Sequence, residues 1–253
     1  MNITQKKWFK PALLTIIIVA LAGISIGVLL FLRNQPAQRR GVVPLVVIQP
    51  MEPDSAKWGL NFPNQYSTFK LTKENLTRTQ YGGSDPFSKL EADPYLKELF
   101  AGYSFSKEYN EERGHMWALE DVQGTARISD KTPGTCYSCK SSSNPSLWAE
   151  LGMEAYDKMS FAELTPRVEY PIGCANCHEA NTMRLIVTNP ALEQALLAQG
   201  KDWKTFTRQE MRTVVCANCH VEYYFKGEGN YLTFPWEKGT TIEAIETYYN
   251  EYG

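Results

Sequence analysis

Three cysteine pairs with the same spacing constrain this chain more than any other feature. All 6 cysteines fall into C-x-x-C runs, so none is left over. The residue after the second cysteine is lysine in the first run and histidine in the other two. The first pair is Cys136 and Cys139, followed by Lys140. The second is Cys174 and Cys177, followed by His178, and the third is Cys216 and Cys219, followed by His220. The repetition predicts three sites of the same chemical kind.

A C-x-x-C-H run is typical of a covalently attached c-type heme. Each cysteine can add to one vinyl group of the porphyrin, and the following residue then binds the iron as an axial ligand. Lys140 takes the place of histidine in the first run, and its amine must lose a proton before it binds the metal. We therefore expect heme c at three sites, with Lys140, His178 and His220 as axial ligands.

Other interpretations of the cysteine pairs remain open. Two pairs could form a four-cysteine zinc site, although this leaves the third pair and the two histidines unused. Thioredoxin-like dithiols need a strand and a helix around each run, which the sequence does not suggest. Disulfides within a pair can form outside the cell, but they are strained.

Histidine is scarce, which allows the axial ligands to be counted. The chain has 3 histidines, and three heme irons have six axial positions. The residues that follow the cysteine pairs fill three positions, and His115 can fill a fourth. Two positions then have no nitrogen ligand from this chain. Because a catalytic iron needs an open position, the count argues against a set of closed electron-transfer hemes.

The N-terminal region predicts a membrane anchor. Three lysines precede an uncharged run from Ala12 to Leu32, which as a helix would cross a bilayer core of about 30 Å. No small-residue cleavage site follows the run, so an uncleaved anchor is favoured over a cleaved signal peptide. Since c-type hemes are attached outside the cytoplasm, we expect the heme domain on the extracytoplasmic side of the cell membrane. The expected segments are a cytoplasmic N-terminus at 1–10, a transmembrane anchor or uncleaved signal at 11–32, a linker at 33–41, and an exported multiheme domain at 42–253.

The rest of the chain predicts a mostly α-helical multiheme cytochrome c with long loops and few short strands. The net charge of −2 gives no basis for nucleic-acid binding. Proline, glycine and cap residues predict where elements begin and end. The expected elements are an edge strand at 42–48, a loop region at 50–90, and helices at 94–100, 144–156, 190–200, from Thr205 or Thr207 through 225, and from Thr240 onward.

The lysine run, the two histidine runs and the continuation at 221–225 resemble the ammonia-forming cytochrome c nitrite reductases, a pentaheme family. The stretches 101–127 and 234–249 are also similar, so the resemblance extends from about residue 45 to 253. Members of that family are much longer. The resemblance therefore implies an N-terminal portion in membrane-anchored form, without the further hemes, the dimer helices and the sixth ligand of the heme at His178.

The resemblance also implies what the residues do. It implies dissimilatory reduction of nitrite to ammonium at the lysine-ligated heme, which bis-histidine hemes supply with electrons. Lys140 is then the proximal ligand of the catalytic iron, and Arg127 and Tyr223 are the catalytic residues on the open side. His115 is the second axial ligand of the heme at His220. Glu222 and the backbone of Tyr223 belong to a Ca²⁺ site. The implied partners are nitrite, a quinol-linked cytochrome or another electron donor, the lipid bilayer, and a second copy in a homodimer.

Two other functions remain open at this point. The first is a membrane-anchored multiheme electron-transfer cytochrome without its own substrate, which the anchor favours and Lys140 does not. The second is a zinc-binding extracellular domain.

Overall fold

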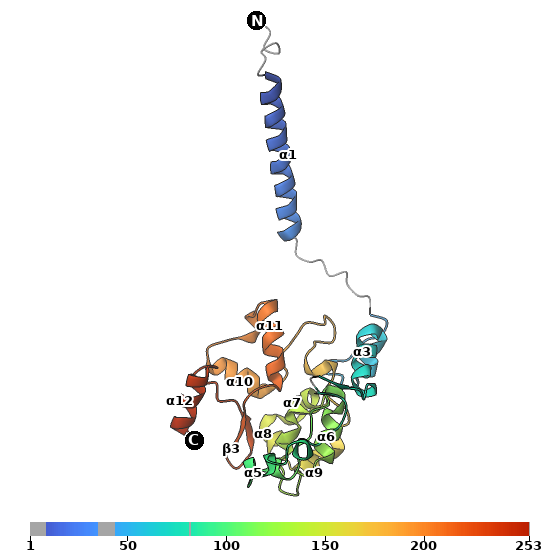
Figure 1. Cartoon of the computed structure of the whole chain (residues 1–253), viewed down its shortest axis with the longest axis vertical. Coiled ribbons are helices and arrows are strands. Elements are labelled where there is room, and N and C mark those ends of the chain that lie inside the picture. Colours follow the sequence, from blue (N-terminus) through green and yellow to red (C-terminus); the bar gives the residue numbers. More distant parts are fainter. Residues whose placement is uncertain (1–8, 35–43, 81, 253) are drawn as a thin grey trace. The chain divides into compact units, whose positions relative to one another are not determined.

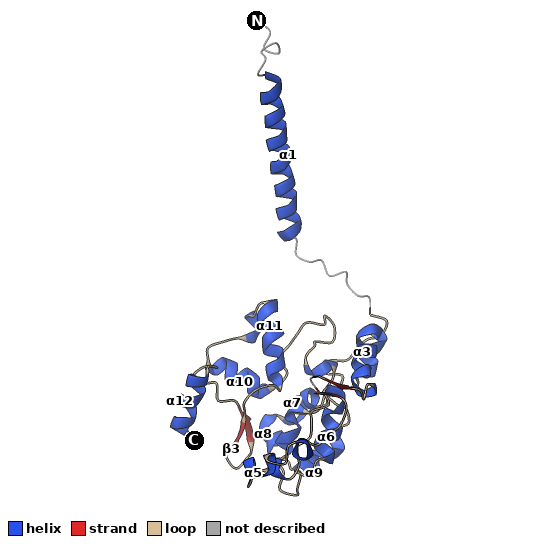
Figure 2. Cartoon of the chain, viewed as in Figure 1, coloured by secondary structure: helices blue, strands red, loops and turns tan. Residues whose placement is uncertain are grey.

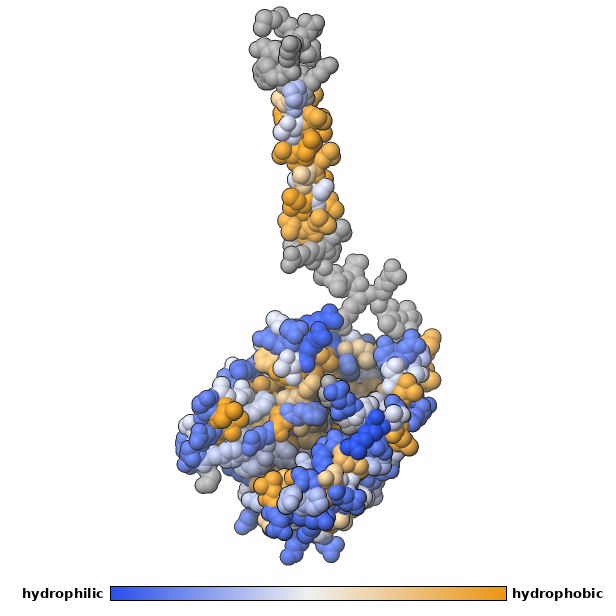
Figure 3. All heavy atoms as spheres, viewed as in Figure 1, coloured by the Kyte–Doolittle hydropathy of each residue, from blue (hydrophilic) through white to orange (hydrophobic). Residues whose placement is uncertain are grey.

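The computed structural model describes residues 9–34, 44–80 and 82–252. The chain divides into two compact units, Met1–Val43 and Pro44–Gly253. The described part of the first unit is one helix, α1 (Phe9–Asn34). Its segment Pro11–Phe31 has a mean hydropathy of 2.8 and is long and apolar enough to cross a membrane. Apolar side chains dominate the face of this helix that Figure 3 shows. Length and composition suit an anchor and a signal sequence equally.

The second unit consists mainly of short helices, as the sequence predicts, and Figure 1 and Figure 2 show their arrangement. The helices are α2 (Ser55–Asn61), α3 (Pro63–Glu74), α4 (Lys89–Ala92), α5 (Leu96–Leu99), α6 (Ala118–Gly124), α7 (Asn144–Leu151), α8 (Met153–Lys158), α9 (Phe161–Leu164), α10 (Pro190–Ala198), α11 (Arg208–Val214) and α12 (Ile242–Tyr252). Two antiparallel hairpins pair β1 (Arg78–Thr79) with β2 (Gly82–Gly83), and β3 (Tyr224–Lys226) with β4 (Tyr231–Thr233). The mostly helical fold is confirmed.

Three apolar clusters hold the second unit together, and each touches one of the cysteine runs. The first contains Tyr137 of the first run and packs against the adjacent Cys136. The second lies around α10 and β4, and Ala217 of the third run packs against it. The third contains Trp58 of α2 and Ala175 of the second run. Apolar burial therefore fixes all three runs in one body.

Several predicted helix boundaries are confirmed. Asn189 caps α10 by accepting a hydrogen bond from the Ala191 amide at 3.0 Å, and Gly200 follows the helix with φ +70°. Thr207 begins α11 through a capping box with Glu210. The last helix also forms, with the Thr241 hydroxyl accepting from the Ala244 amide at 3.3 Å.

Two predicted helices extend further than the structure allows. The helix expected at 144–156 breaks at Gly152, where φ is +76°, and continues as α8. The helix from Thr207 ends at Val214, so it does not reach 225. The chain then forms a 3₁₀ turn at Val215–Asn218, and β3 pairs with β4. Strand pairing in the second case outweighs the helical pattern in the sequence.

The region before residue 100 differs most from the sequence prediction. The predicted strand at 42–48 is wrong for residues 44–48, and residues 42–43 lie outside the described part. The Asn61 amide binds the backbone of this segment instead, accepting from the Leu45 and Val46 amides at 2.8 and 3.0 Å. The predicted loop at 50–90 contains α2 and α3, whose starts are marked by Asp54 and Pro63. The helix expected at 94–100 is the shorter α5.

Candidate heme site

The three cysteine runs form turns, which we call the first loop (Cys136–Lys140), the second loop (Cys174–His178) and the third loop (Cys216–His220). The second and third loops share the backbone hydrogen bond that closes the turn. In each, the histidine amide donates to the carbonyl of the first cysteine at 2.9 Å. In the first loop, the Lys140 amide donates to the Tyr137 carbonyl at 2.8 Å instead. The lysine run therefore differs from the histidine runs in backbone structure as well as in its last residue.

The three loops lie against one another. A hydrogen bond between two thiols of different loops lowers the pKa of Cys139 and raises that of Cys219. Burial, with the nearby thiols of Cys216 and Cys174, raises the pKa of Cys177 to about 11. All six cysteines lie in the described residues and are free thiols. Segments far apart in the sequence thus meet at one cluster of cysteines.

Buried side chains hold the first loop from its inner side. Tyr137 is 0 % exposed, and its ring stacks on Phe161 with ring centroids 4.1 Å apart. Its hydroxyl lies 2.9 Å from the Thr165 hydroxyl. The Asn144 amide donates to the Tyr137 carbonyl at 2.6 Å, and Tyr156 donates to the Asn144 carbonyl oxygen at 2.9 Å. These contacts fix the backbone from which Lys140 projects.

Arg127 and Tyr223 lie near the outer side of the first loop. The Arg127 guanidinium donates to the Thr125 hydroxyl at 3.2 Å and lies 4.9 Å from the centre of the Phe105 ring. Burial and then the thiols of the first loop raise the pKa of Tyr223, whereas Arg127 lowers it. Lys140 and Arg127 in turn both act to lower the pKa of Cys136, which burial raises overall. The three predicted catalytic residues are therefore within electrostatic range of the Cys136 thiol.

His115 and His220 face each other. Their ring centroids are 6.3 Å apart, and the ring planes are inclined by 45°. Gly114, with φ +93°, turns the chain into the 3₁₀ turn His115–Trp117. Partial burial, and then His220, lower the pKa of His115 and so favour the neutral ring that binds metals. A metal ion bound by both rings would need two metal–nitrogen bonds of about 2 Å, plus the distance from each ring centre to its nitrogen. This sum is close to the observed separation of the ring centroids.

His178 is oriented by its own loop. Its Nδ1 lies 3.0 Å from the Met183 carbonyl oxygen, so the other ring nitrogen is free to bind a metal. Met183 has φ +56°, an unusual backbone conformation that brings this carbonyl to the ring. A hydrogen bond of this kind on the second nitrogen is typical of metal-bound histidines.

The residues predicted for Ca²⁺ are less complete. The Tyr249 hydroxyl donates to Glu222 Oε1 at 3.3 Å. Across the described ranges, no group of three or more His, Cys, Asp or Glu side chains is arranged to hold a metal ion. A Ca²⁺ site at Glu222 would therefore depend on carbonyl oxygens or on residues outside this chain. The same finding gives no support to a four-cysteine zinc site.

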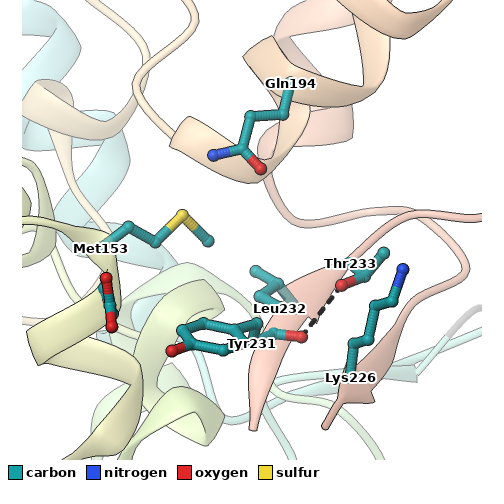
Figure 4. A pocket seen from close by; sticks show the side chains of 7 residues that line it. Met153, Gln194, Lys226, Tyr231, Leu232 and Thr233 are labelled. Atoms are coloured by element: carbon teal, nitrogen blue, oxygen red, sulfur yellow. Dashed lines mark hydrogen bonds between the residues drawn. The ribbon is translucent and has the colours of Figure 1, made fainter. Parts of the chain in front are cut away.

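The two best-formed cavities do not coincide with the loops. One, of about 360 Å³, is lined by Glu154 and by the six residues labelled in Figure 4, which come from α8, α10 and the β3–β4 hairpin. The other, of about 440 Å³, lies between α3 and the segment Glu112–Gly114. Neither is lined by Lys140, Arg127 or Tyr223.

Sequence reasoning missed the residues that hold the predicted site in place. Thr125 and Phe105 contact the Arg127 guanidinium. Asn176 and Asn218 form a second group, whose side chains connect the loops by hydrogen bonds. The only signal for the second group was that both histidine runs read C-A-N-C-H, with Asn176 and Asn218 at the same position.

Comparisons with known proteins agree with the loop pattern. Residues 54–253 match the family model described as cytochrome c552. The cytochrome c-552 of Parabacteroides distasonis is 44% identical over 213 residues, which cover 81% of this chain and 43% of that protein. The cytochrome c-552 of Bacteroides fragilis is 42% identical over 213 residues, with the same coverage of 81% and 43%. This chain thus spans less than half the length of the curated relatives it matches.

A solved structure agrees as well. The cytochrome c nitrite reductase catalytic subunit of Desulfovibrio desulfuricans, described as having two calcium sites, is similar with a TM-score of 0.73 and 34% identity. The match covers 81% of this chain and 48% of that one.

Proposed function

Since this chain belongs to the cytochrome c552 family of ammonia-forming nitrite reductases, we propose that its first loop carries the catalytic heme of a nitrite reductase. The observation that carries the proposal is that Arg127 and Tyr223 both lie within electrostatic range of the Cys136 thiol, in the loop that ends at Lys140. Tyr223 is far from the other residues in the sequence. Surface residues without a common role would have no reason to meet at one cysteine pair.

The heme would supply a redox-active iron, with electrons arriving from the neighbouring hemes. Lys140 would bind that iron through its neutral amine, and the buried contacts of Tyr137 fix the backbone from which the Lys140 side chain projects. Arg127 binds the nitrite anion by charge-assisted hydrogen bonds, which its guanidinium geometry suits. Tyr223 has a raised pKa, so it stays protonated near neutral pH and donates a hydrogen bond or a proton to the anion.

The third loop would hold a bis-histidine relay heme. The 6.3 Å separation of the His115 and His220 rings supports this assignment, because an iron bound by both rings needs a gap of about that size. The second loop would hold a third heme c through His178, and its sixth ligand would come from outside this chain. The heme at the third loop would transfer electrons and leave substrate binding to the first loop.

The remaining assignments follow from the family and from α1. Glu222 and the Tyr223 carbonyl would supply part of a Ca²⁺ site. The segment 11–32 would anchor the chain in the cell membrane, with residues 1–10 in the cytoplasm, 33–41 as a linker and the domain 42–253 on the outer side. A quinol-linked cytochrome or another donor would provide electrons, and a second copy would complete a dimer.

The test is to express the full chain in cells that attach c-type hemes and to measure its iron and its pyridine hemochrome spectrum. The proposal predicts three hemes per chain. It also predicts that nitrite changes the optical spectrum of the heme at the first loop and leaves the spectrum of the heme at the third loop, bound by His115 and His220, unchanged. Binding is the better readout than turnover, because the chain spans only part of its relatives. Protein without iron, or with zinc in its place, would overturn the proposal.

The same experiment distinguishes a nitrite reductase from the alternative, an electron-transfer cytochrome without a substrate. That alternative predicts three hemes and a nitrite response that is the same in the wild type and in Lys140→Ala. If the first loop carries the catalytic heme, Lys140→Ala should instead remove the part of the nitrite response that belongs to this heme, while the other two hemes keep their spectra.

A further inference from the structure

Asn176 and Asn218 occupy the same position in the second and third loops. Both side chains are buried, with exposed fractions of 4% and 3%. A buried primary amide is costly unless its hydrogen-bonding groups are satisfied. The partners of these two amides therefore show what the asparagines hold together.

The Asn218 side chain connects the third loop to the second. Its oxygen accepts from the Thr188 and Asn189 amides, both at 3.1 Å. Its nitrogen donates to the Asn176 carbonyl at 3.3 Å and to the Val215 carbonyl at 3.0 Å. The amide is thus fully satisfied, and one of its bonds crosses directly from one loop to the other.

Two further bonds strengthen this connection. The Thr188 hydroxyl donates to the Asn176 carbonyl at 2.7 Å. The Asn189 side chain, 1 % exposed, donates to the Asn218 carbonyl at 2.7 Å. The segment before α10 is therefore hydrogen-bonded to both histidine loops at once.

The Asn176 side chain connects the second loop to the first. Its nitrogen donates to the carbonyl of Ser141, the residue after Lys140, at 3.0 Å. Its oxygen accepts from the Gly173 amide at 2.9 Å. The third loop also reaches the first, because the Cys139 thiol lies 3.9 Å from the Asn218 carbonyl oxygen. Buried polar contacts therefore join the three loops in pairs.

The first loop has no such residue. Its equivalent position is Ser138, a buried serine whose side chain is too short to reach the other loops. The long amide side chain is present only in the two loops that make inter-loop bonds. Serine at this position is nevertheless compatible with a folded C-x-x-C turn, which provides a natural substitution for a test.

We propose that Asn176 and Asn218 are positioning residues that set the spacing and relative orientation of the three hemes. The proposal rests on the function proposed above. Because thioether bonds attach each porphyrin to the cysteines of its loop, a shift of one loop displaces its heme by a similar amount. The asparagines thereby govern how electrons pass between the hemes, without touching substrate or iron.

The test compares the full heme-loaded wild-type chain with Asn218→Ser and Asn176→Ser. Electron paramagnetic resonance of the oxidised protein detects magnetic coupling between neighbouring irons, and an optical reductive titration reports how the hemes influence one another. The matched control is Asn181→Ser, because Asn181 is exposed and its side chain contacts only Glu179 in its own turn.

The expected result is three hemes per chain in each variant, with loss of the coupled resonance signals and a changed titration curve in Asn218→Ser and Asn176→Ser only. A variant with a full heme load whose resonance spectrum and titration match the wild type would overturn the proposal. A lower melting temperature with both readouts unchanged would overturn it too, since the asparagines would then serve stability alone.

A milder variant covers the case in which the asparagine variants fail to fold. Thr188→Val removes only the hydroxyl bond to the Asn176 carbonyl, and it should reduce the coupled signals while keeping all three hemes. Unchanged signals in Thr188→Val, with the asparagine variants unfolded, count against the proposal. Wild-type chain without heme would refute the proposed function itself, and the hemochrome spectrum detects this before any variant is made.

Discussion

The inner and outer sides of the first loop are built in opposite ways. On the inner side, Tyr137, Tyr156 and Leu164 are fully buried; Tyr137 stacks on Phe161, and Asn144 connects Tyr137 to Tyr156 by hydrogen bonds. On the outer side, Arg127 is exposed and Tyr223 keeps 50% of its surface. Arg127 is held there by one hydroxyl and one aromatic ring.

This difference suggests that the inner side stabilises the fold and that the outer side binds the ligand. Residues of the inner side stabilise the turn that presents Lys140, and they contact nothing beyond the core. Residues of the outer side add little to stability because solvent screens their interactions, yet they carry the charge and the proton that an anion requires. Variants of the inner side should therefore unfold the chain, and variants of the outer side should weaken ligand binding alone.

The largest expected effect is that of Tyr137→Ala. Removing a fully buried aromatic ring that stacks on Phe161 should lower the free energy of unfolding by about 3–5 kcal/mol. Chemical denaturation monitored by circular dichroism measures this change. Tyr103→Ala is the matched control, because Tyr103 is 70% exposed and its loss should change stability by less than about 0.5 kcal/mol. Equal effects of the two substitutions would contradict the comparison.

The next effect concerns a buried carboxyl on the inner side. Asp157 is 0% exposed; its Oδ2 accepts from the Leu232 amide at 3.2 Å, and its Oδ1 has no partner. Burial raises the pKa of Asp157 to about 6. In the unfolded chain the carboxyl ionises near pH 4, so between about pH 4 and 6 the unfolded state releases its proton first. Stability from this group is therefore complete at low pH and is lost as pH rises to about 6.

Asp157→Asn removes this titration and keeps an oxygen for the Leu232 amide. The variant should gain stability relative to the wild type as pH rises from 4 to 7, by up to about 3 kcal/mol. Denaturation at several pH values measures the difference. Asp130→Asn, at an exposed position, controls for the change in charge. A difference that does not vary with pH would show that Asp157 is ionised in the folded protein throughout this range.

Arg127→Ala tests the outer side. Loss of a charge-assisted hydrogen bond should weaken nitrite binding by about 1.5–3 kcal/mol, or roughly 10- to 100-fold. The melting temperature should not change. An optical titration of the heme-loaded chain with nitrite measures the affinity. Arg184→Ala is the control, since Arg184 is also an exposed arginine. A stable variant with unchanged affinity would remove Arg127 from the site.

The sequence was sufficient for the parts of this molecule that depend on short-range patterns. The cap at Asn189, the capping box at Thr207 and the glycine after α10 all follow from residues within a few positions of each other. The resemblance in these motifs also led to the correct family. The predicted roles of Lys140, Arg127 and Tyr223 remain predictions, although the structure brings the three together.

What the sequence could not provide depends on contacts between distant segments. Residues 44–48 would extend a sheet only if another strand lay beside them, and Asn61 binds their backbone instead. The helix expected through 225 gives way to a hairpin because Tyr224 finds a partner in Thr233. The hydrogen bonds of Asn176 and Asn218 join positions 42 residues apart. No local pattern records such pairings, so they appear only in the folded chain.

The smallest expected effect concerns the helix that leads into the third loop, on the exposed surface. Thr207 accepts from the Glu210 amide at 3.3 Å, and the Glu210 carboxylate accepts from the Thr207 amide at 2.7 Å. Thr207→Ala should lower the free energy of unfolding by about 1 kcal/mol, whereas Thr213→Ala inside the same helix should be neutral or slightly stabilising. Hydrogen bonds from Thr207 lower the pKa of Glu210, so the part of the loss due to this carboxylate should disappear as pH falls through that lowered pKa. If Thr207→Ala instead destabilised the chain as strongly as Tyr137→Ala, exposed positions would share the role of the core, and the two sides of the first loop would not divide folding from binding.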